Sequence, residues 1–168
     1  MNRRRPVDTG AVMRRLPALL STLAVGALLW PAPAAPAAAP KPWATVNLCD
    51  PAGHPGAMGV RVGVPAGPGS QWIRVRVEWY DARTRGWSLA FGGDGGWSRL
   101  GGGRGGVRGG NTFTFPVPAP GKVLLLRGVV EVEWRAGKQV RRKRTVRTSN
   151  GHAKSAGGHS WAQCVVPG

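Results

Sequence analysis

The stretch Trp72-Ile73-Arg74-Val75-Arg76-Val77-Glu78-Trp79-Tyr80 decides the fold, because its apolar and polar residues alternate without a break. One face would carry Ile73, Val75, Val77 and Trp79, and the other face would carry the charged side chains between them. A period of two, rich in β-branched and aromatic residues, is typical of an antiparallel strand with one buried face. The stretch therefore predicts a strand of a sheet that covers a core on one side.

The same alternation recurs along the chain after residue 43, and helical spacing is not found there. Further strands are predicted over residues 45–48, 60–64, 112–115, 123–134, 140–148 and 161–166. Ala136-Gly137-Lys138 is expected to form a hairpin turn. Uneven strand spacing favours a sandwich over a closed barrel. The predicted fold is all-β, an immunoglobulin-like antiparallel two-sheet sandwich of about seven strands, preceded by a signal peptide.

The first 39 residues have the three-part layout of a secretory signal peptide. Five arginines precede an uncharged apolar run over residues 16–30, and small residues with Ala-x-Ala sites follow. A retained membrane anchor is the alternative, but a spanning helix needs about 20 apolar residues and this run is shorter. We expect a signal peptide and processing region over 1–39, a short linker over 40–43 and the sandwich over 44–168. The protein is thus expected to be secreted and to meet the membrane only through its signal peptide.

The chain has two cysteines, Cys49 and Cys164, which stand 115 positions apart. In an oxidising compartment the simplest prediction is one disulfide, and two free thiols are the alternative. Closing a loop of this length would stabilise the fold by roughly 4 to 5 kcal/mol. The bond would also bring Asp50 and His54 towards the two later histidines. Their spacing matches no zinc pattern, so neither a metal nor another cofactor is expected.

The chain resembles a group of secreted immunoglobulin-like domains from high-GC, actinobacterial-type bacteria. The resemblance lies in residues 45–50 (Thr-Val-Asn-Leu-Cys-Asp), 72–77, 126–135 and the closing Cys164, and it covers most of the chain after the signal. It implies a sandwich, but no particular activity and no functional residue. Antibody-type domains carry a Trp about a dozen residues after the first Cys, whereas Trp79 is 30 positions beyond Cys49. The cysteines at the chain ends therefore predict a bond unlike the inter-sheet bond of antibodies.

Charge is the second conspicuous property, since 19 basic and 6 acidic residues follow residue 40. Such a balance favours anionic polymers as partners. The alternative is a compositional origin, because most of the basic residues are arginine among abundant Gly, Ala and Pro, as GC-rich coding produces. The densest group, Arg141, Arg142, Lys143 and Arg144, is the candidate basic edge.

On a strand, the basic edge would form two rows, not one patch. A three-residue hairpin loop would place Glu133 opposite Arg141 and Glu131 opposite Lys143. The edge would then serve either to prevent sheet-to-sheet aggregation or to bind a polyanion. A separate candidate binding face consists of Trp72, Arg74, Arg76 and Tyr80, whose aromatic rings could stack on sugars or anchor a partner protein. The alternative is that these rings only pack at the strand ends. Residues 92–110, mostly glycine, are expected to form a mobile loop.

No motif of a nucleophile, a zinc hydrolase or paired catalytic carboxylates occurs, so no catalytic residue is predicted. The function expected from the sequence is a secreted, non-enzymatic binding or surface-interaction module of the cell envelope. Its partner would be an anionic or glycan envelope component or another protein, and nucleic acid is not expected. A purely structural extracellular domain without a ligand is the main alternative, and a hydrolase is a remote one.

Overall fold

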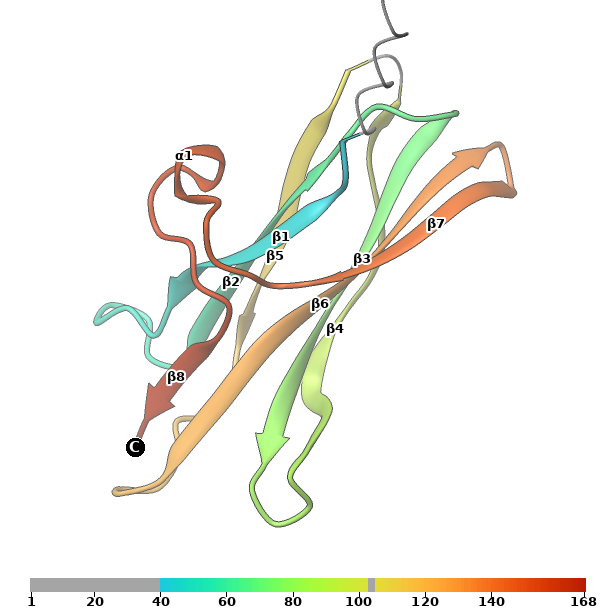
Figure 1. The fold of residues 1–168 in the computed structure, drawn as a ribbon. Coiled ribbons are helices and arrows are strands. Elements are labelled where there is room, and N and C mark those ends of the chain that lie inside the picture. Colours follow the sequence, from blue (N-terminus) through green and yellow to red (C-terminus); the bar gives the residue numbers. More distant parts are fainter. Residues whose placement is uncertain (1–39, 103–104) are drawn as a thin grey trace, which may run out of the picture. The chain divides into compact units, whose positions relative to one another are not determined.

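The computed structural model describes residues 40–102 and 105–168 (Figure 1). The predicted signal peptide, residues 1–39, lies outside the described residues. In chain order the elements are β1 (Trp43–Cys49), β2 (Ala57–Val64), β3 (Ser70–Asp81), β4 (Gly86–Gly102), β5 (Val107–Thr114), β6 (Val123–Ala136), β7 (Gln139–Arg147), α1 (Ala153–Ala156) and β8 (Cys164–Pro167).

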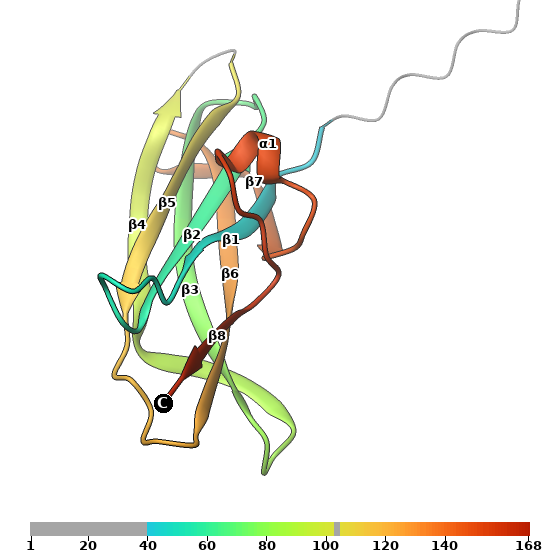
Figure 2. The same cartoon turned by 90° about the vertical axis from the view of Figure 1, so that its left-hand side faces the viewer.

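The strands form two antiparallel sheets, which confirms the predicted sandwich (Figures 1 and 2). One sheet has three strands in the order β1-β2-β5. The other has five, in the order β4-β3-β6-β7, with β8 also paired to β6. Both β7 and β8 lie along the same side of β6, at its two ends. As a result, β4 and β7 are edge strands of the larger sheet.

The core lies between the two sheets and is built from alternate residues of the strands, as the sequence periodicity predicts. On β3, the side chains of Ile73, Val75 and Val77 are fully buried. They pack with inward residues of β2 and β6, among them Val60, Val62, Leu126, Val130, Val132 and Trp134. Each fully buried aliphatic side chain stabilises the fold by roughly 1.5 to 3 kcal/mol relative to exposure.

The prediction of a mobile loop over residues 92–110 is wrong, since β4 continues to Gly102 and β5 begins at Val107. A glycine offers the same N–H and C=O groups to a sheet ladder as any other residue, so pairing with β3 and β2 determines the local structure. Close packing also requires some of these glycines. An added Cβ would lie 2.3 Å from Leu100 at Gly109, and 2.0 Å from the Val60 carbonyl oxygen at Gly110.

The predicted register of the β6–β7 hairpin is also wrong. The loop has two residues, because Ala136 pairs with Gln139, and Gly137 adopts φ +61°. A register shift then leaves Arg141 without a partner, so that Glu133 lies opposite Lys143. A bulge adds one residue to one strand only, so a register counted from the hairpin loop alone is shifted beyond it.

One short helix was not expected from the sequence. Helix α1 has four residues and lies in the connection between β7 and β8. A single turn is too short to show helical periodicity. No helix in the described part of the chain is long and apolar enough to cross a membrane.

The predicted disulfide between Cys49 and Cys164 is present. It connects the end of β1, in the three-stranded sheet, to the start of β8, in the five-stranded sheet. The prediction of a bond unlike the inter-sheet bond of antibodies is wrong to the extent that this bond, too, joins the two sheets. The spacing of cysteines along a chain does not reveal which sheet each terminal strand enters. Such a bond is compatible with an extracellular protein.

Candidate functional site

The predicted binding face lies on the outer surface of the five-stranded sheet. Trp72, Arg74, Arg76 and Tyr80 alternate with the buried residues of β3, and all four are partly exposed. Four carboxylates lie among them, one from β3 itself and three from the neighbouring strands β4 and β6. We call this surface the ionic face, and its charged residues are Arg74, Arg76, Glu78, Asp94, Arg127, Glu131, Glu133, Arg135 and Lys143.

Every charged side chain of the ionic face belongs to an ion pair. Arg76 contacts Glu131 at 2.5 Å, and Arg127 contacts Glu78 at 2.7 Å. The ammonium of Lys143 lies 3.2 Å from Glu131 and 3.6 Å from Glu133. Arg135 also contacts Glu133, at 2.7 Å. Five cations thus face four carboxylates, which leaves little net charge on this surface.

The pair between Arg74 and Asp94 joins β3 to the edge strand β4. The guanidinium donates hydrogen bonds to both carboxylate oxygens of Asp94, and the amide of Gly96 donates another. Hydrogen bonding by Arg74 lowers the pKa of Asp94 to about 2, and the backbone N–H of Gly96 adds to this effect. The same pairing raises the pKa of Arg74. Both groups are therefore charged at all physiological pH values.

Aromatic rings hold two of these arginines in place. The guanidinium of Arg135 lies 4.7 Å from the ring centroid of Trp72 and 4.6 Å from that of Trp97. Arg127 lies 4.0 Å from the ring centroid of Trp87. These distances are within the range of cation–π attraction, so Trp72 is already occupied by a protein cation. Packing and pairing within the sheet account for most of the residues that the sequence suggested as a ligand-binding surface.

The basic edge is the surface of β7 that carries Arg141, Arg142, Lys143 and Arg144. The prediction of two rows is confirmed by the pairing: Lys143 points to the ionic face, whereas Arg142 lies over the ring of the buried Trp134 at 4.7 Å. Arg141 and Arg144 are exposed. Within residues 40–102 and 105–168, Arg141, Arg142, Arg144 and the following Arg147 take part in no ion pair.

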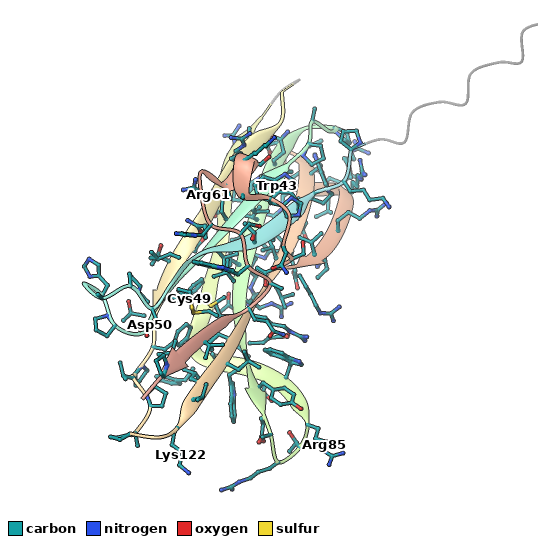
Figure 3. All side chains as sticks on the ribbon, turned by 60° about the vertical axis from the view of Figure 1, so that its left-hand side comes forward. Trp43, Cys49, Asp50, Arg61, Arg85 and Lys122 are labelled. Atoms are coloured by element: carbon teal, nitrogen blue, oxygen red, sulfur yellow. A yellow bond between two sulfur atoms is a disulfide. The ribbon has the colours of Figure 1, made fainter. Side chains whose placement is uncertain are left out.

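His152 does not lie close to Asp50, contrary to the expectation from the disulfide. His152 stacks on Trp43, at the start of β1, whereas Asp50 follows the end of that strand and accepts a hydrogen bond from Gly56 N at 2.7 Å. Trp43 and Asp50 lie well apart (Figure 3). A strand of seven residues is roughly 20 Å long. The described residues contain no group of three or more His, Cys, Asp or Glu side chains that could hold a metal.

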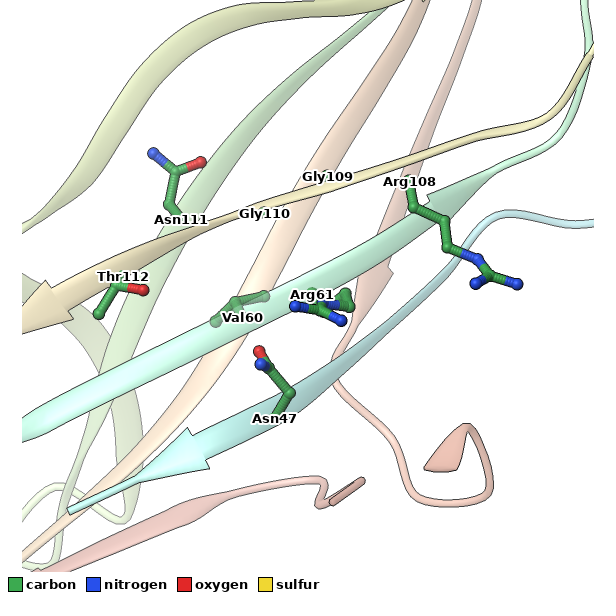
Figure 4. Close-up of a pocket in the computed structure, with 8 residues that line it drawn as sticks. All are labelled: Asn47, Val60, Arg61, Arg108, Gly109, Gly110, Asn111 and Thr112. Carbon is green, nitrogen blue, oxygen red and sulfur yellow. The ribbon is translucent and has the colours of Figure 1, made fainter. Parts of the chain in front are cut away.

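A hollow that sequence reasoning missed lies on the outer face of the three-stranded sheet (Figure 4). Its volume is about 400 Å³. We call it the glycine hollow, and its lining includes Asn47, Arg61, Arg108, Gly109, Gly110 and Thr112. The alternation in β2 places Arg61 on the outer face, but only the β2–β5 register reveals that Arg61 lies opposite Gly110 and Arg108 opposite Gly63.

Comparisons with known proteins leave the family open. No protein-family model matches the chain, and no curated protein matches it. Among solved structures, the chain is similar to the sporulation control protein Spo0M from Bacillus subtilis, with 16% identity and a TM-score of 0.34. The match covers 64% of this chain and 47% of the Spo0M chain. At this level the similarity carries no functional argument.

Proposed function

We propose that this protein is a secreted, non-enzymatic binding module that attaches to anionic polymers of the cell envelope through its basic edge. The observation that carries the proposal is the separation of charge over the domain. Four of the six carboxylates after residue 40 are paired on the ionic face, whereas four arginines of β7 have no carboxylate partner among the described residues.

Geometry at the basic edge suits an extended partner. β7 is an edge strand, so within residues 40–102 and 105–168 no further strand of the sheet pairs with its outer side. Arg141, Arg144 and Arg147 are all exposed along it, with Arg144 and Arg147 on opposite faces of the strand. A polymer that carries negative charge at regular intervals contacts several such guanidinium groups at once. Attraction of this kind weakens as salt is added, because exposed charges are screened over about 8 Å at physiological ionic strength.

The ionic face is a weaker candidate for the same polymer. Arg74 and Arg76 are bound to carboxylates, so an incoming anion would have to displace Asp94 or Glu131. The resemblance to secreted bacterial domains and the disulfide between Cys49 and Cys164 both support the proposed location outside the cell.

Retention by isolated cell walls at low and high salt tests the proposal. Arg141→Ser with Arg144→Ser is expected to lower retention severalfold at low salt. A matched control, Arg83→Ser with Lys122→Ser, removes the same charge from two exposed turns and should retain binding. If the wild type and both variants are retained equally, or if none is retained, the edge is not a binding surface and the purely structural alternative is favoured.

A further inference from the structure

The glycine hollow has the composition of a ligand site, in contrast to the ionic face. Among the residues that the structure describes, two arginines line it and no acidic residue does. Arg61 and Arg108 are both exposed, and each lies opposite a glycine on the neighbouring strand. Because a glycine has no side chain, the surface between the two guanidinium groups stays open. The hollow is therefore a concave, positively charged surface without an internal counter-ion.

One of the two arginines is held in position by the protein. Nη1 of Arg61 donates a hydrogen bond of 2.7 Å to the carbonyl oxygen of Ala156 in α1. Ala156 is buried, and the preceding turn is fixed by a hydrogen bond from His152 N to Ser160 Oγ at 2.9 Å. A guanidinium has five donors, so most of those of Arg61 remain for a ligand. An arginine that is already oriented loses less entropy when it binds an anion.

The size and lining of the hollow restrict what it could bind. Its volume of about 400 Å³ is within the range of small-molecule sites and is much larger than one inorganic anion needs. Asn47 and Thr112 supply an amide and a hydroxyl group, and Figure 4 shows Asn47 extending from β1 towards Arg61. The apolar side chain in the lining, Val60, is itself buried. A suitable ligand is therefore polar, carries several hydroxyl groups and has one anionic group.

We propose that the glycine hollow binds an acidic sugar, with the carboxylate or phosphate between Arg61 and Arg108 and sugar hydroxyl groups on Asn47 and Thr112. Arginine pairs with either kind of oxyanion through parallel N–H donors. A second hollow, which extends to Lys41 and Trp43, shares Arg108 and gives room for a neighbouring sugar of a chain. This site is on the opposite sheet from the basic edge, so the inference goes beyond the proposed function and does not depend on it.

Titration of the ¹⁵N-labelled domain, followed by NMR, tests this inference. The probes are glucuronate, glucose 6-phosphate, glucose and inorganic phosphate, each at the same ionic strength. We expect glucuronate, glucose 6-phosphate or both to shift the amide signals of Gly109 and Gly110 in a saturable way. Comparing the shifts caused by glucuronate with those caused by glucose 6-phosphate shows whether the anionic group is a carboxylate or a phosphate. Glucose and inorganic phosphate should give much weaker shifts.

Three variants make the test specific. Arg108→Gln should weaken binding of the acidic sugar by about tenfold, since a charge-assisted hydrogen bond is lost. Arg61→Gln should do the same, and unchanged amide signals elsewhere would show that the fold is intact. Arg83→Gln is the charge-matched control and should bind like the wild type.

The inference is overturned if neither acidic sugar shifts these signals, or if inorganic phosphate shifts them equally well. It is also overturned if Arg83→Gln weakens binding as much as Arg108→Gln, because the effect is then one of net charge. Since neither Arg61 nor Arg108 belongs to the basic edge, any of these results leaves the retention experiment with cell walls unaffected.

Discussion

Cys49 at the end of β1 is bonded to Cys164 at the start of β8, and this bond links the two sheets of the sandwich. The backbone of the first strand also pairs with the C-terminal segment at two isolated bridges, Ala44 with Thr148 and Val46 with Trp161. The disulfide therefore holds the two sheets together where the first strand meets the last strand.

Removing the disulfide should cost stability without changing the fold class. For Cys49→Ser with Cys164→Ser we expect the free energy of unfolding to fall by about 4 to 5 kcal/mol, because the unfolded chain regains the freedom of a 115-residue loop. Urea denaturation of the purified domain measures this. Wild type with reductant should match the double variant. Equal urea midpoints with and without the bond would contradict the expectation.

The pair between Arg74 and Asp94 should make stability depend on acid pH. The pKa of Asp94 is about 2 in the folded state, below the value of about 3.9 for an unfolded chain. Its contribution is therefore present above about pH 4 and is lost as the pH falls towards 2. Since the pair is partly exposed, Asp94→Asn should lower the free energy of unfolding at pH 7 by only about 0.2 to 1 kcal/mol.

Urea denaturation at several pH values between 7 and 2 measures the effect of Asp94→Asn. The difference in the free energy of unfolding between the variant and the wild type should shrink below pH 4. Asp81→Asn is a suitable control, because Asp81 accepts a backbone hydrogen bond from Arg83 and forms no ion pair within the described residues. If the difference in the free energy of unfolding stayed constant across the whole pH range, Asp94 would stabilise the fold by something other than its charge.

Gly110 should not tolerate a side chain. In Gly110→Ala the new Cβ would lie 2.0 Å from the carbonyl oxygen of Val60, so β5 would have to move away from β2. Such overpacking typically costs about 1 to 3 kcal/mol. Thermal unfolding followed by circular dichroism checks this. The matched control is Gly53→Ala, where an added Cβ meets nothing within 4 Å, and a similar loss there would rule out the steric explanation.

Among the aromatic residues, Trp134 should cause the largest loss of stability when it is replaced by alanine. Its side chain is fully buried, and Nε1 donates a hydrogen bond to the Pro65 carbonyl oxygen at 3.2 Å. Trp134→Ala is expected to cost about 3 to 5 kcal/mol through the cavity that it leaves. The control is Phe91→Ala on β4, since Phe91 is 100% exposed and its loss should be nearly neutral. Chemical denaturation of both variants compares them directly, and a similar cost at both positions would contradict this account.

The buried faces could be predicted because a strand presents alternate residues to the core. Ile73, Val75 and Val77 follow this rule, and so do Leu126, Val130, Val132 and Trp134 of β6. The hairpin register could not be predicted, since the extra residue Arg141 depends on a bulge opposite Trp134 and Arg135. The strand β4 was missed for a related reason. Glycine has a low strand propensity, and only its partner β3 makes the segment extended.

The candidate site was harder to predict than the fold. Arg74 and Arg76 are conspicuous in the sequence, but their partners Asp94 and Glu131 come from other strands and neutralise them. Conversely, Arg61 and Arg108 stand 47 positions apart and are inconspicuous. They form one hollow only because β2 pairs with β5.

Local alternation and the two cysteines were enough to determine an all-β sandwich closed by a disulfide, because the pattern of burial and the chemistry of the thiols are properties of the chain itself. Tertiary structure alone decided which charges are paired, which edge is left basic and where a hollow opens. Those features depend on the register between strands that are distant in sequence, and a single bulge changes which residues lie opposite each other.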